Sequence, residues 1–556
     1  MWKCMEYKVL YDNRDDSLLM RLLKIRNVEE HIDQFLDPKL SDFWKDPFLL
    51  NDMEKAVDRI IAAIKNQEKI MIFWDYDVDG VTSSYILYKC FTKYLGYKNI
   101  SITYPDRIKD GYGMKCHHID TMKAKNIDLI ITVDNWITAI AEALRAKELG
   151  IDMIITDHHK QLETIPDAFA VVNPQISPNY SFKWIAGVGV AFKLINALLM
   201  KSKFTPEKKN QIFHYFLPIV AIGTVADVVP LVDENRVLVK QWLEIINKFP
   251  ERIPSSLRGL LKFLNIQKDV DTFHIWYVIG PRINAGGRIA SPYDSLNSLL
   301  YSGEKQLEYL TTLETINTER KWMQDQMFKN AENTVDLDQR ILTIASENFH
   351  EGVVWIVAGK LTEKYYKPSA VFKIDTEKGT ASASLRGPAY FDVITMIQSA
   401  AHLLERFGGH RWAGGLTVKI ENLDPLCRYF EAYCLEHITD EHLIKTDTVD
   451  TPLYDHEWND ETLSQINKLA PFGEGNQEPT FLLKDMTIHK IEKVWSTGKG
   501  HLKIYAQHGD NKVNILFWSK WDLVSSIDKS ENISIVGKIK RDTFNGGRYV
   551  DWIAII

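Results

Sequence analysis

The sequence has few cysteines and no long hydrophobic run. Its five cysteines (Cys4, Cys90, Cys116, Cys427 and Cys434) contain no CxxC pair. This spacing excludes a disulfide framework or a cysteine zinc site and is typical of the reducing cytosol, where we expect the protein. No stretch of about 18 apolar residues occurs, and the first residues lack the apolar segment of a secretory signal. We therefore expect neither a membrane span nor a membrane partner.

Several common catalytic motifs are also missing. There is no GxxxxGK[ST] phosphate loop, so an ATP-driven motor is not indicated, and neither a GxSxG elbow nor an HExxH helix occurs. The net charge of −7, from 67 Lys and Arg against 74 Asp and Glu, argues against a protein that coats nucleic acid through bulk charge. The distribution is uneven, because residues 481–556 contain 12 basic and 8 acidic residues. That local charge of +4 is compatible with an enzyme that grips one strand end.

The chain is long enough for three or four domains, with 556 residues at roughly 150 residues per domain. Three short apolar runs, at 69–77, 128–134 and 152–159, alternate with amphipathic helical patterns. Continuous apolar runs of this kind are typical of parallel strands that are buried on both faces. They predict a doubly wound α/β sheet, preceded by a helix over about 51–67 with Asn51 as its N-cap.

The rest of the chain predicts three further parts. A long polar helix over about 303–333 would connect two lobes, and a second α/β domain would contain strands in VVWIVAG (353–359) and SAVFKI (369–374). Five or so short alternating strands after about residue 475 favour a small barrel of the OB type. The expected organisation is an N-terminal segment 1–50, a first α/β domain 51–300, a connector helix 301–336, a second α/β domain 337–440, a linker 441–475 and an OB-like domain 476–556.

Acidic residues follow each of the three predicted strands of the first domain. In chain order they are Asp75, Asp77 and Asp79, then Asp134, then Asp157 with His158 and His159, while Asp227 lies farther on in AIGTVADVVPL. The carboxyl ends of parallel strands meet in one crevice, where so many carboxylates would repel one another unless cations lay among them. Oxygen and imidazole ligands suit Mn²⁺ or Mg²⁺, and two such ions about 3.5–4 Å apart would bridge a water and clamp a phosphoryl oxygen. The pattern therefore predicts metal-assisted phosphoester hydrolysis.

A set of ordered motifs makes a family resemblance visible. DYDVDG (75–80), VDN (133–135), DHH (157–159) and GTVADVVPL (223–231) resemble the motifs of the DHH phosphoesterase superfamily, and GPRINAGGRI (280–289) and FGGHRWAGG (407–415) resemble its later motifs. With an OB-like tail that contains PFGEGNQEP (471–479), the whole chain is similar to the superfamily's 5′→3′ exonucleases specific for single-stranded DNA. The resemblance implies a DHH catalytic domain, a second domain of the DHHA1 type and the OB-like domain.

The resemblance also implies roles for the acidic residues and histidines. The metal ligands would be Asp77, Asp79, Asp134, His158 and Asp227. Asp75 would support the first motif, either as a further metal ligand or as a residue that contacts the ligands rather than the metal. His159 would contact the scissile phosphate, or it would act as an acid without binding the metal itself.

Further residues would contact the DNA strand by the same resemblance. They are Arg107 and Tyr112 in DRIKDGYG (106–113), Arg282, Asn284 and Arg288, Ser384 and Arg386, and Gly409 and His410. Arg282, Asn284 and Arg288 would bind phosphates. His410 would close over the substrate from the second lobe, where Gly409 allows the backbone to approach a phosphate closely.

Three positions depart from the family pattern. Trp74 and Trp136 stand where the family usually has glycine. They would either pack beneath the site as core, which is the arrangement we favour, or narrow its mouth and stack a base. In SASLRG (382–387), Ala383 occupies the place of an arginine expected to anchor the 5′ phosphate, and Arg386 is the candidate replacement.

The leading hypothesis is a cytosolic exonuclease that uses two Mn²⁺ or Mg²⁺ ions to degrade single-stranded DNA from its 5′ end to mononucleotides, in DNA repair and recombination. We expect a monomer, with a helicase or a single-strand-binding protein as a candidate partner. One alternative is a nano-RNase or cyclic-dinucleotide phosphodiesterase, from which the OB-like tail distinguishes this chain. Another is a catalytically silent single-strand-binding scaffold, a class marked by lost metal ligands, whereas every proposed ligand is present here.

Overall fold

The computed structural model describes residues 6–105, 113–135, 139–160, 164–266, 269–494, 500–527, 532–542 and 546–555. These residues form two compact units. The N-terminal unit comprises Leu18–Asn317 with Ser464–Glu478, and the C-terminal unit comprises Met1–Ser17, Thr318–Leu463 and Pro479–Ile556. Among the described residues, no helix combines the length and the apolar character needed to cross a membrane.

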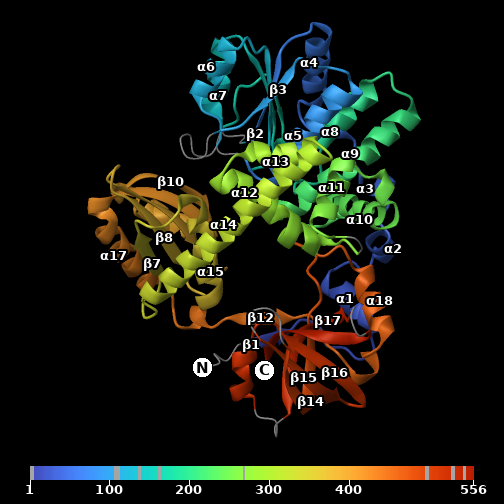
Figure 1. Cartoon of the computed structure of the whole chain (residues 1–556), viewed down its shortest axis with the longest axis vertical. Helices are drawn as coiled ribbons and strands as arrows, with labels where there is room; N and C mark the ends of the chain where they lie inside the picture. The colour runs from blue at the N-terminus through green and yellow to red at the C-terminus, as the bar shows by residue number, and fades with distance from the viewer. Residues whose placement is uncertain are drawn as a thin grey trace. The chain divides into compact units, whose positions relative to one another are not determined.

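A parallel sheet of five strands forms the centre of the N-terminal unit (Figure 1). The strand order is β3 (Ile100–Thr103), β2 (Ile70–Trp74), β4 (Leu129–Val133), β5 (Asp152–Thr156) and β6 (Ala170–Val172). Every residue of β2 and β4 is buried, as expected for strands with helices on both faces. The predicted doubly wound α/β sheet is confirmed.

Two groups of helices cover the sheet. Side chains that alternate along β2 separate them, because Met71 and Phe73 point to one side and Ile70, Ile72 and Trp74 to the other. The first side packs on α6 (Cys116–Ala124) and α7 (Ile140–Glu148), and the second on α4 (Met53–Lys65), α5 (Val78–Lys89) and α8 (Gly187–Lys201) (Figure 1). The expected cap of α4 is wrong, because Asp52 is its N-cap, and Asn51 donates instead to the carbonyl of Ile176.

Further helices complete the N-terminal unit. They are α1 (Leu18–Ile25), α2 (Ile32–Leu36), α3 (Leu40–Phe43), α9 (Pro206–Ala226), α10 (Asp233–Lys248), α11 (Ser255–Phe263), η5 (His274–Ile279), α12 (Gly280–Ile289) and α13 (Pro292–Leu300). α9 and α10 are joined by the turn that follows Asp227. α14 (Glu304–Thr334) begins in this unit and ends in the other, which matches the predicted connector helix.

The segment Ser464–Glu478 lies far along the sequence but belongs to the N-terminal unit. The Leu231 amide donates to the carbonyl of Glu474 at 2.7 Å, and the buried Arg236 guanidinium donates to the carbonyls of Leu469 and Ala470 at 2.9 and 3.1 Å. Arg236 also donates to Phe35, near the start of the unit. The segment therefore packs on the turn between α9 and α10.

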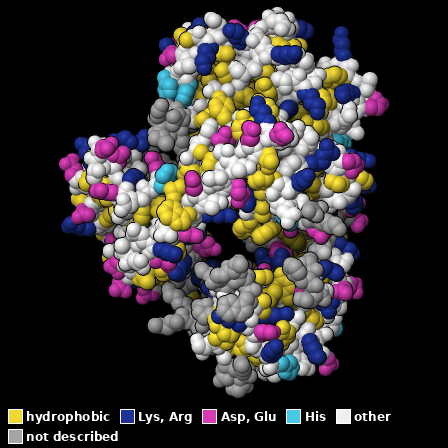
Figure 2. Space-filling model, in the orientation of Figure 1, with side chains coloured by type: hydrophobic (Ala, Val, Ile, Leu, Met, Phe, Trp, Pro, Cys, Tyr) yellow, Lys and Arg dark blue, Asp and Glu magenta, His cyan; other side chains and the backbone are white. Residues whose placement is uncertain are grey.

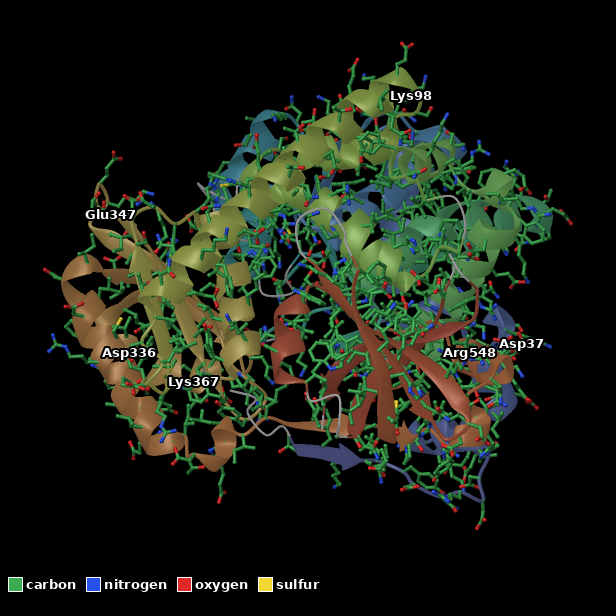
Figure 3. All side chains as sticks on the ribbon, turned by 60° about the horizontal axis from the view of Figure 1, so that its bottom comes forward. Asp37, Lys98, Asp336, Glu347, Lys367 and Arg548 are labelled. Atoms are coloured by element: carbon green, nitrogen blue, oxygen red, sulfur yellow. The ribbon has the colours of Figure 1, made fainter. Side chains whose placement is uncertain are left out.

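The C-terminal unit contains the predicted second α/β sheet. Its strand order is β10 (Leu404–His410), β11 (Ala413–Lys419), β9 (Thr380–Arg386), β8 (Ser369–Asp375) and β7 (Leu342–Ser346), with helices α15 (Glu351–Tyr365), α16 (Val393–Ser399) and α17 (Ile420–His437). Lys367, labelled in Figure 3, donates to the carbonyls of Leu337 and Gln339 and so holds the start of β8 near the start of β7. The predicted strand in VVWIVAG is wrong, because those residues lie in α15; a short apolar run alone does not distinguish a strand from a buried helix.

A closed barrel of five strands is the last part of the C-terminal unit. The strands are β14 (Phe481–Val494), β15 (His501–His508), β16 (Asn511–Phe517), β18 (Arg548–Ile555) and β17 (Ile533–Arg541), and pairing of β14 with β17 closes the ring. Burial alternates along β15, as expected for a strand with one face in a barrel core. Arg548, labelled in Figure 3, pairs with Asp460 at 2.6 Å. The OB-like barrel is confirmed.

Candidate metal centre

Each acidic motif is positioned by the end of a regular element. Asp75 and Asp77 follow β2, and the Oδ1 of Asp77 caps α5 by accepting from the Gly80 amide at 3.0 Å. Asp134 follows β4 in a left-handed conformation, with φ of 51°, which aspartate tolerates better than most residues. Asp227 is the C-cap of α9. Asp157, His158 and His159 follow β5.

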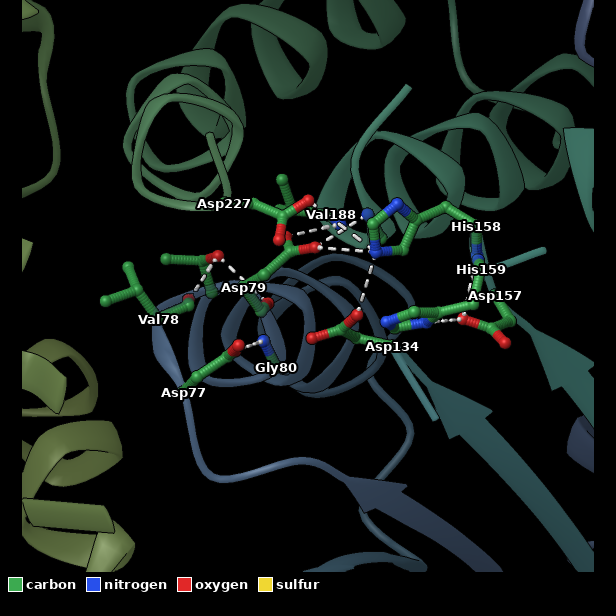
Figure 4. Close-up of polar contacts among 12 residues, drawn as sticks. Asp77, Val78, Asp79, Gly80, Asp134, Asp157, His158, His159, Val188 and Asp227 are labelled. Atoms are coloured by element: carbon green, nitrogen blue, oxygen red, sulfur yellow. Dashed lines mark hydrogen bonds and ion pairs between the residues drawn. The ribbon is translucent and has the colours of Figure 1, made fainter. Parts of the chain in front are cut away.

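Three of these carboxylates converge around the imidazole of His158 (Figure 4). Its Nε2 lies 3.2 Å from Oδ1 of Asp134, 3.6 Å from Oδ2 of Asp227 and 3.8 Å from Oδ2 of Asp79. The three carboxylates come from the β4 end, the α9 end and the first turn of α5. The structure thus brings together residues that are about 150 positions apart in the sequence.

Asp79 is held in place by backbone amides that the sequence patterns did not single out. Its two carboxylate oxygens accept from the amides of Gly187 and Val188, at 2.7 and 2.8 Å, at the N-terminus of α8. Gly187 lies so close that a Cβ there would be 2.8 Å from Asp79 Oδ2 and 2.8 Å from Asp134 Cβ. The signal was present in AGVGVAF (186–192), whose two glycines stand at the start of a helix.

Burial and mutual repulsion disfavour ionisation of the carboxylates. Burial, followed by the charge of Asp77, raises the pKa of Asp79 to about 7. Burial and neighbouring carboxylates also raise the pKa values of Asp134 and Asp227 well above their ordinary range. Carboxylates with raised pKa values in one small volume gain strongly from a bound cation.

The two histidines have opposite protonation states. Burial lowers the pKa of His158 to about 3, so its imidazole is neutral, as a metal ligand must be. Burial also opposes the charge on His159, but the Asp157 carboxylate, 2.7 Å from its Nδ1, outweighs burial and raises the His159 pKa to about 10. His159 is therefore a cation at neutral pH, beside the carboxylate cluster.

The donor atoms suit divalent cations. Among the described residues, three groups of ligand atoms each lie within 4.8 Å of one another: Asp79, His158 and Asp227; Asp75, Asp77 and Asp134; and Asp134, Asp157, His158 and His159. Nε2 of His158 and Oδ2 of Asp227 are buried and make no hydrogen bond with any residue that the structure describes. Oxygen-rich sites with one imidazole fit Mn²⁺ and Mg²⁺. These residues therefore fit the predicted metal centre.

The residues expected to bind phosphates from α12 have protein partners. Arg282 forms a two-pronged ion pair with Glu314, with a distance of 3.1 Å from Nη2 to Oε1. Oδ1 of Asn284 accepts from the Val78 amide at 3.1 Å, so this side chain supports the loop of the first motif. Arg288 is half-buried on the same helix.

The other expected substrate residues lie in the second α/β sheet. β9 alternates so that Ala383 is 7% exposed in the core, whereas Ser384 and Arg386 share the opposite face. An arginine at position 383 would point into the core, whereas Arg386 lies on the opposite face of β9, with its guanidinium 5.7 Å from the Trp355 ring of α15. Its Nη1 lies 3.3 Å from Ser384 Oγ, and burial, with the nearby Arg386 charge, lowers the pKa of His410. Gly409, next to His410, has φ of 153°, which favours glycine.

The structure shows which of the two expected arrangements Trp74 adopts. Trp74 is fully buried and packs edge-on against Tyr104 with ring centroids 5.7 Å apart, which confirms the arrangement as core. Trp136, Arg107 and Tyr112 lie outside the described residues.

Three domain models match the chain. Residues 69–224 match the DHH family, N-terminal domain, residues 338–436 match the DHHA1 domain, and residues 449–554 match the RecJ OB domain. Fold and site thus define a protein of the DHH class. The sequence is 32% identical over 487 residues to the single-stranded-DNA-specific exonuclease RecJ of Haemophilus influenzae, covering 84% of this chain and 82% of that protein. The chain belongs to the RecJ family.

Other relatives agree with this assignment. The RecJ of Bacillus subtilis is 34% identical over 520 residues, which cover 92% of this chain but only 64% of that longer protein. Among solved structures, RecJ of Thermus thermophilus in complex with Mn²⁺ has the same fold, with a TM-score of 0.84 at 24% identity, covering 100% of this chain and 80% of that one. An exonuclease RecJ bound to manganese matches with a TM-score of 0.61 at 28% identity, covering 70% of this chain and 96% of that one.

Proposed function

We propose that the protein is an exonuclease that hydrolyses phosphodiester bonds of single-stranded DNA from the 5′ end and releases mononucleotides. The observation that carries this proposal is the convergence of carboxylates from three sequence motifs around the neutral His158 (Figure 4). The names of the relatives, single-stranded-DNA-specific exonuclease RecJ, support the substrate. Manganese in related structures supports a metal-dependent reaction.

In this proposal, two of the three ligand groups hold two Mn²⁺ or Mg²⁺ ions. Asp79, His158 and Asp227 would hold one ion, and Asp75, Asp77 and Asp134 the other. Bound ions of this kind supply a water of lowered pKa and neutralise charge on the phosphoryl oxygens. Gly187 and Val188 would keep both oxygens of Asp79 oriented through their amides.

His159 would act on the substrate rather than on a metal. The Asp157 carboxylate accepts from its Nδ1 and keeps the ring charged, so Nε2 can donate to a phosphate oxygen or to the leaving oxygen. A protonated imidazole there stabilises the negative charge that develops during hydrolysis.

Residues of the second α/β domain would hold the strand end. Ser384 and Arg386 of β9, with Gly409 and His410 of β10, present a hydroxyl, a cation, an accessible backbone and an imidazole from the two strands that flank β11. Arg107 and Tyr112 are proposed to contact the strand as well. Arg282 would exchange Glu314 for a phosphate, Asn284 would hold the first motif in place, and Arg288 would add positive charge. On the face drawn in Figure 2, Lys and Arg are interspersed with Asp and Glu, which fits a few local contacts better than coating.

The family resemblance also supports a proposed role in DNA repair and recombination. In that role, a helicase or a single-strand-binding protein would present the strand to the enzyme, which we propose to be a monomer. The closed barrel favours long single strands over the short substrates of a nano-RNase or cyclic-dinucleotide phosphodiesterase. The intact ligand set disfavours a silent scaffold.

The test incubates the protein and Mn²⁺ with single strands labelled at the 5′ or the 3′ end. We expect mononucleotides released from the 5′ end, and loss of release on addition of EDTA. Asp134→Ala should abolish turnover, whereas Asp167→Ala, which removes an exposed carboxylate paired with Lys147, should retain it. Release from the 3′ end would refute the polarity, and preferred cleavage of di- or trinucleotides of RNA would refute the substrate. Full turnover by Asp134→Ala would refute the metal assignment.

A further inference from the structure

A tryptophan beside the metal centre is left half exposed. Trp184 is 50% exposed, whereas Trp74 and Trp242 in the same unit are fully buried. It precedes Gly187, whose amide holds Asp79, by three residues. About half of its surface is therefore accessible to a ligand.

The backbone of Trp184 is tied to both sides of the metal centre. On one side, Nε2 of Gln175 donates to the carbonyl of Lys183 at 2.7 Å and approaches that of His158 at 3.4 Å. This amide therefore joins the tryptophan loop to the loop that carries the ligand His158.

On the other side, the buried Asn235 makes the connection. Its Nδ2 donates to the carbonyl of Trp184 at 2.7 Å and to that of Pro230 at 3.0 Å. Pro230 lies three residues after the ligand Asp227 in the turn between α9 and α10. The indole is thus carried on a backbone that is fixed relative to both ligands.

A cation accompanies the indole. Nζ of Lys160 lies 6.0 Å from the centroid of the Trp184 ring, and Lys160 directly follows the charged His159. A half-exposed indole with an ammonium group 6.0 Å from its centroid matches one nucleotide of a single strand, because the base can stack on the ring while the phosphate meets the cation.

We propose that Trp184, with Lys160, is a base-stacking platform that positions the single strand at the metal centre. The inference rests on the proposed function, since it specifies how that site holds its substrate. It also assigns to Trp184 the stacking role for which Trp74, now part of the core, had been a candidate. Stacking is indifferent to base identity, so the platform adds affinity for a strand without reading its sequence.

The test compares Trp184→Ala and Trp184→Phe with the wild type on 5′-phosphorylated oligothymidylate in Mn²⁺. We expect Trp184→Ala to raise KM about tenfold, the loss of one stacked base, with kcat changed less than twofold. Trp184→Phe should restore most of the affinity, because it keeps an aromatic face. Mn²⁺ affinity, measured by calorimetry, should be equal in all three proteins.

The chain offers a matched control. Phe249 is another exposed aromatic residue with a cation over its ring, Arg252 at 4.3 Å, and it lies at the far end of α10 from Asn235. Phe249→Ala should leave KM unchanged. A KM increase equal to that of Trp184→Ala would show a general effect of losing an exposed aromatic ring, and would overturn the proposal.

Abasic substrates separate stacking from a structural role. A strand whose residues near the 5′ end lack bases has nothing to stack, so wild type and Trp184→Ala should have the same KM on it. If Trp184→Ala raises KM equally on abasic and normal strands, or lowers the affinity for Mn²⁺, the stacking role is overturned. Absence of cleavage by the wild type would refute the proposed function instead; binding of the oligonucleotide in Ca²⁺, followed by anisotropy, would still test Trp184.

Discussion

Replacing Gly187 by alanine should damage the metal centre far more than the fold. The new Cβ would lie 2.8 Å from both Oδ2 of Asp79 and Cβ of Asp134, whereas ordinary contacts begin at 3.4 Å. Each of these groups must therefore move by about 0.6 Å. Metal–ligand distances tolerate only about 0.2 Å, so we expect Mn²⁺ affinity to fall about 10–100-fold. Overpacking should cost about 1–3 kcal/mol of folding free energy.

The assay combines a calorimetric Mn²⁺ titration with thermal unfolding of the metal-free protein. Gly189→Ala is the matched control, because its Cβ would lie 2.3 Å from Cγ1 of Ile185 in the same helix region and would meet no carboxylate. Both variants should lose stability, but only Gly187→Ala should lose metal affinity. Equal Mn²⁺ affinities in the two variants would refute the reasoning that Gly187 keeps space for the ligands.

Three further predictions concern charge and connectivity. Asp157→Asn should remove the charge that raises the His159 pKa to about 10. We therefore expect kcat to fall at pH 8, where His159 would lose its proton, and to persist below pH 6. An unchanged pH profile of kcat would contradict this role of Asp157. In EDTA, the free energy of unfolding should decrease by at least about 4 kcal/mol as pH rises from about 4 to 7, because native Asp79, with its pKa raised to about 7, keeps a proton that the unfolded chain releases. The raised pKa values of Asp134 and Asp227 act in the same direction. Denaturant titrations at the two pH values measure this, and Mn²⁺ should restore stability at pH 8. Arg236→Met should cost about 2–4 kcal/mol and expose residues 464–478 to proteolysis, because their carbonyls lose a buried donor.

The metal centre could be predicted because it obeys a rule of the fold. Parallel strands present their carboxyl ends at one edge, so acids after three apolar runs had to meet, and Asp79, Asp134 and His158 do. The strands themselves could be predicted because their apolar runs are continuous and short. The same criterion predicts a strand at residues 353–359, which is wrong, because a buried helix such as α15 has an equally continuous apolar run.

Other features depend on contacts between distant parts of the chain. Nothing near Arg282 in the sequence predicts that Glu314 engages it. The glycines of AGVGVAF indicate the start of a helix, but they do not show that the Gly187 and Val188 amides donate to Asp79. The register of β9 was also needed, because only strand alternation shows that Arg386 and position 383 lie on opposite faces of the strand. Such pairings follow from tertiary packing, which a local pattern does not encode.

The segment Ser464–Glu478 bears on how the protein is made. Synthesis proceeds from the N-terminus, so the turn after Asp227 emerges from the ribosome long before Glu474, the residue whose carbonyl its Leu231 amide needs. The connector helix and the second α/β sheet are completed in between. The turn after Asp227 therefore gains these contacts only late in translation, and a shortened chain that ends after the second sheet would leave the Arg236 guanidinium without most of its acceptors.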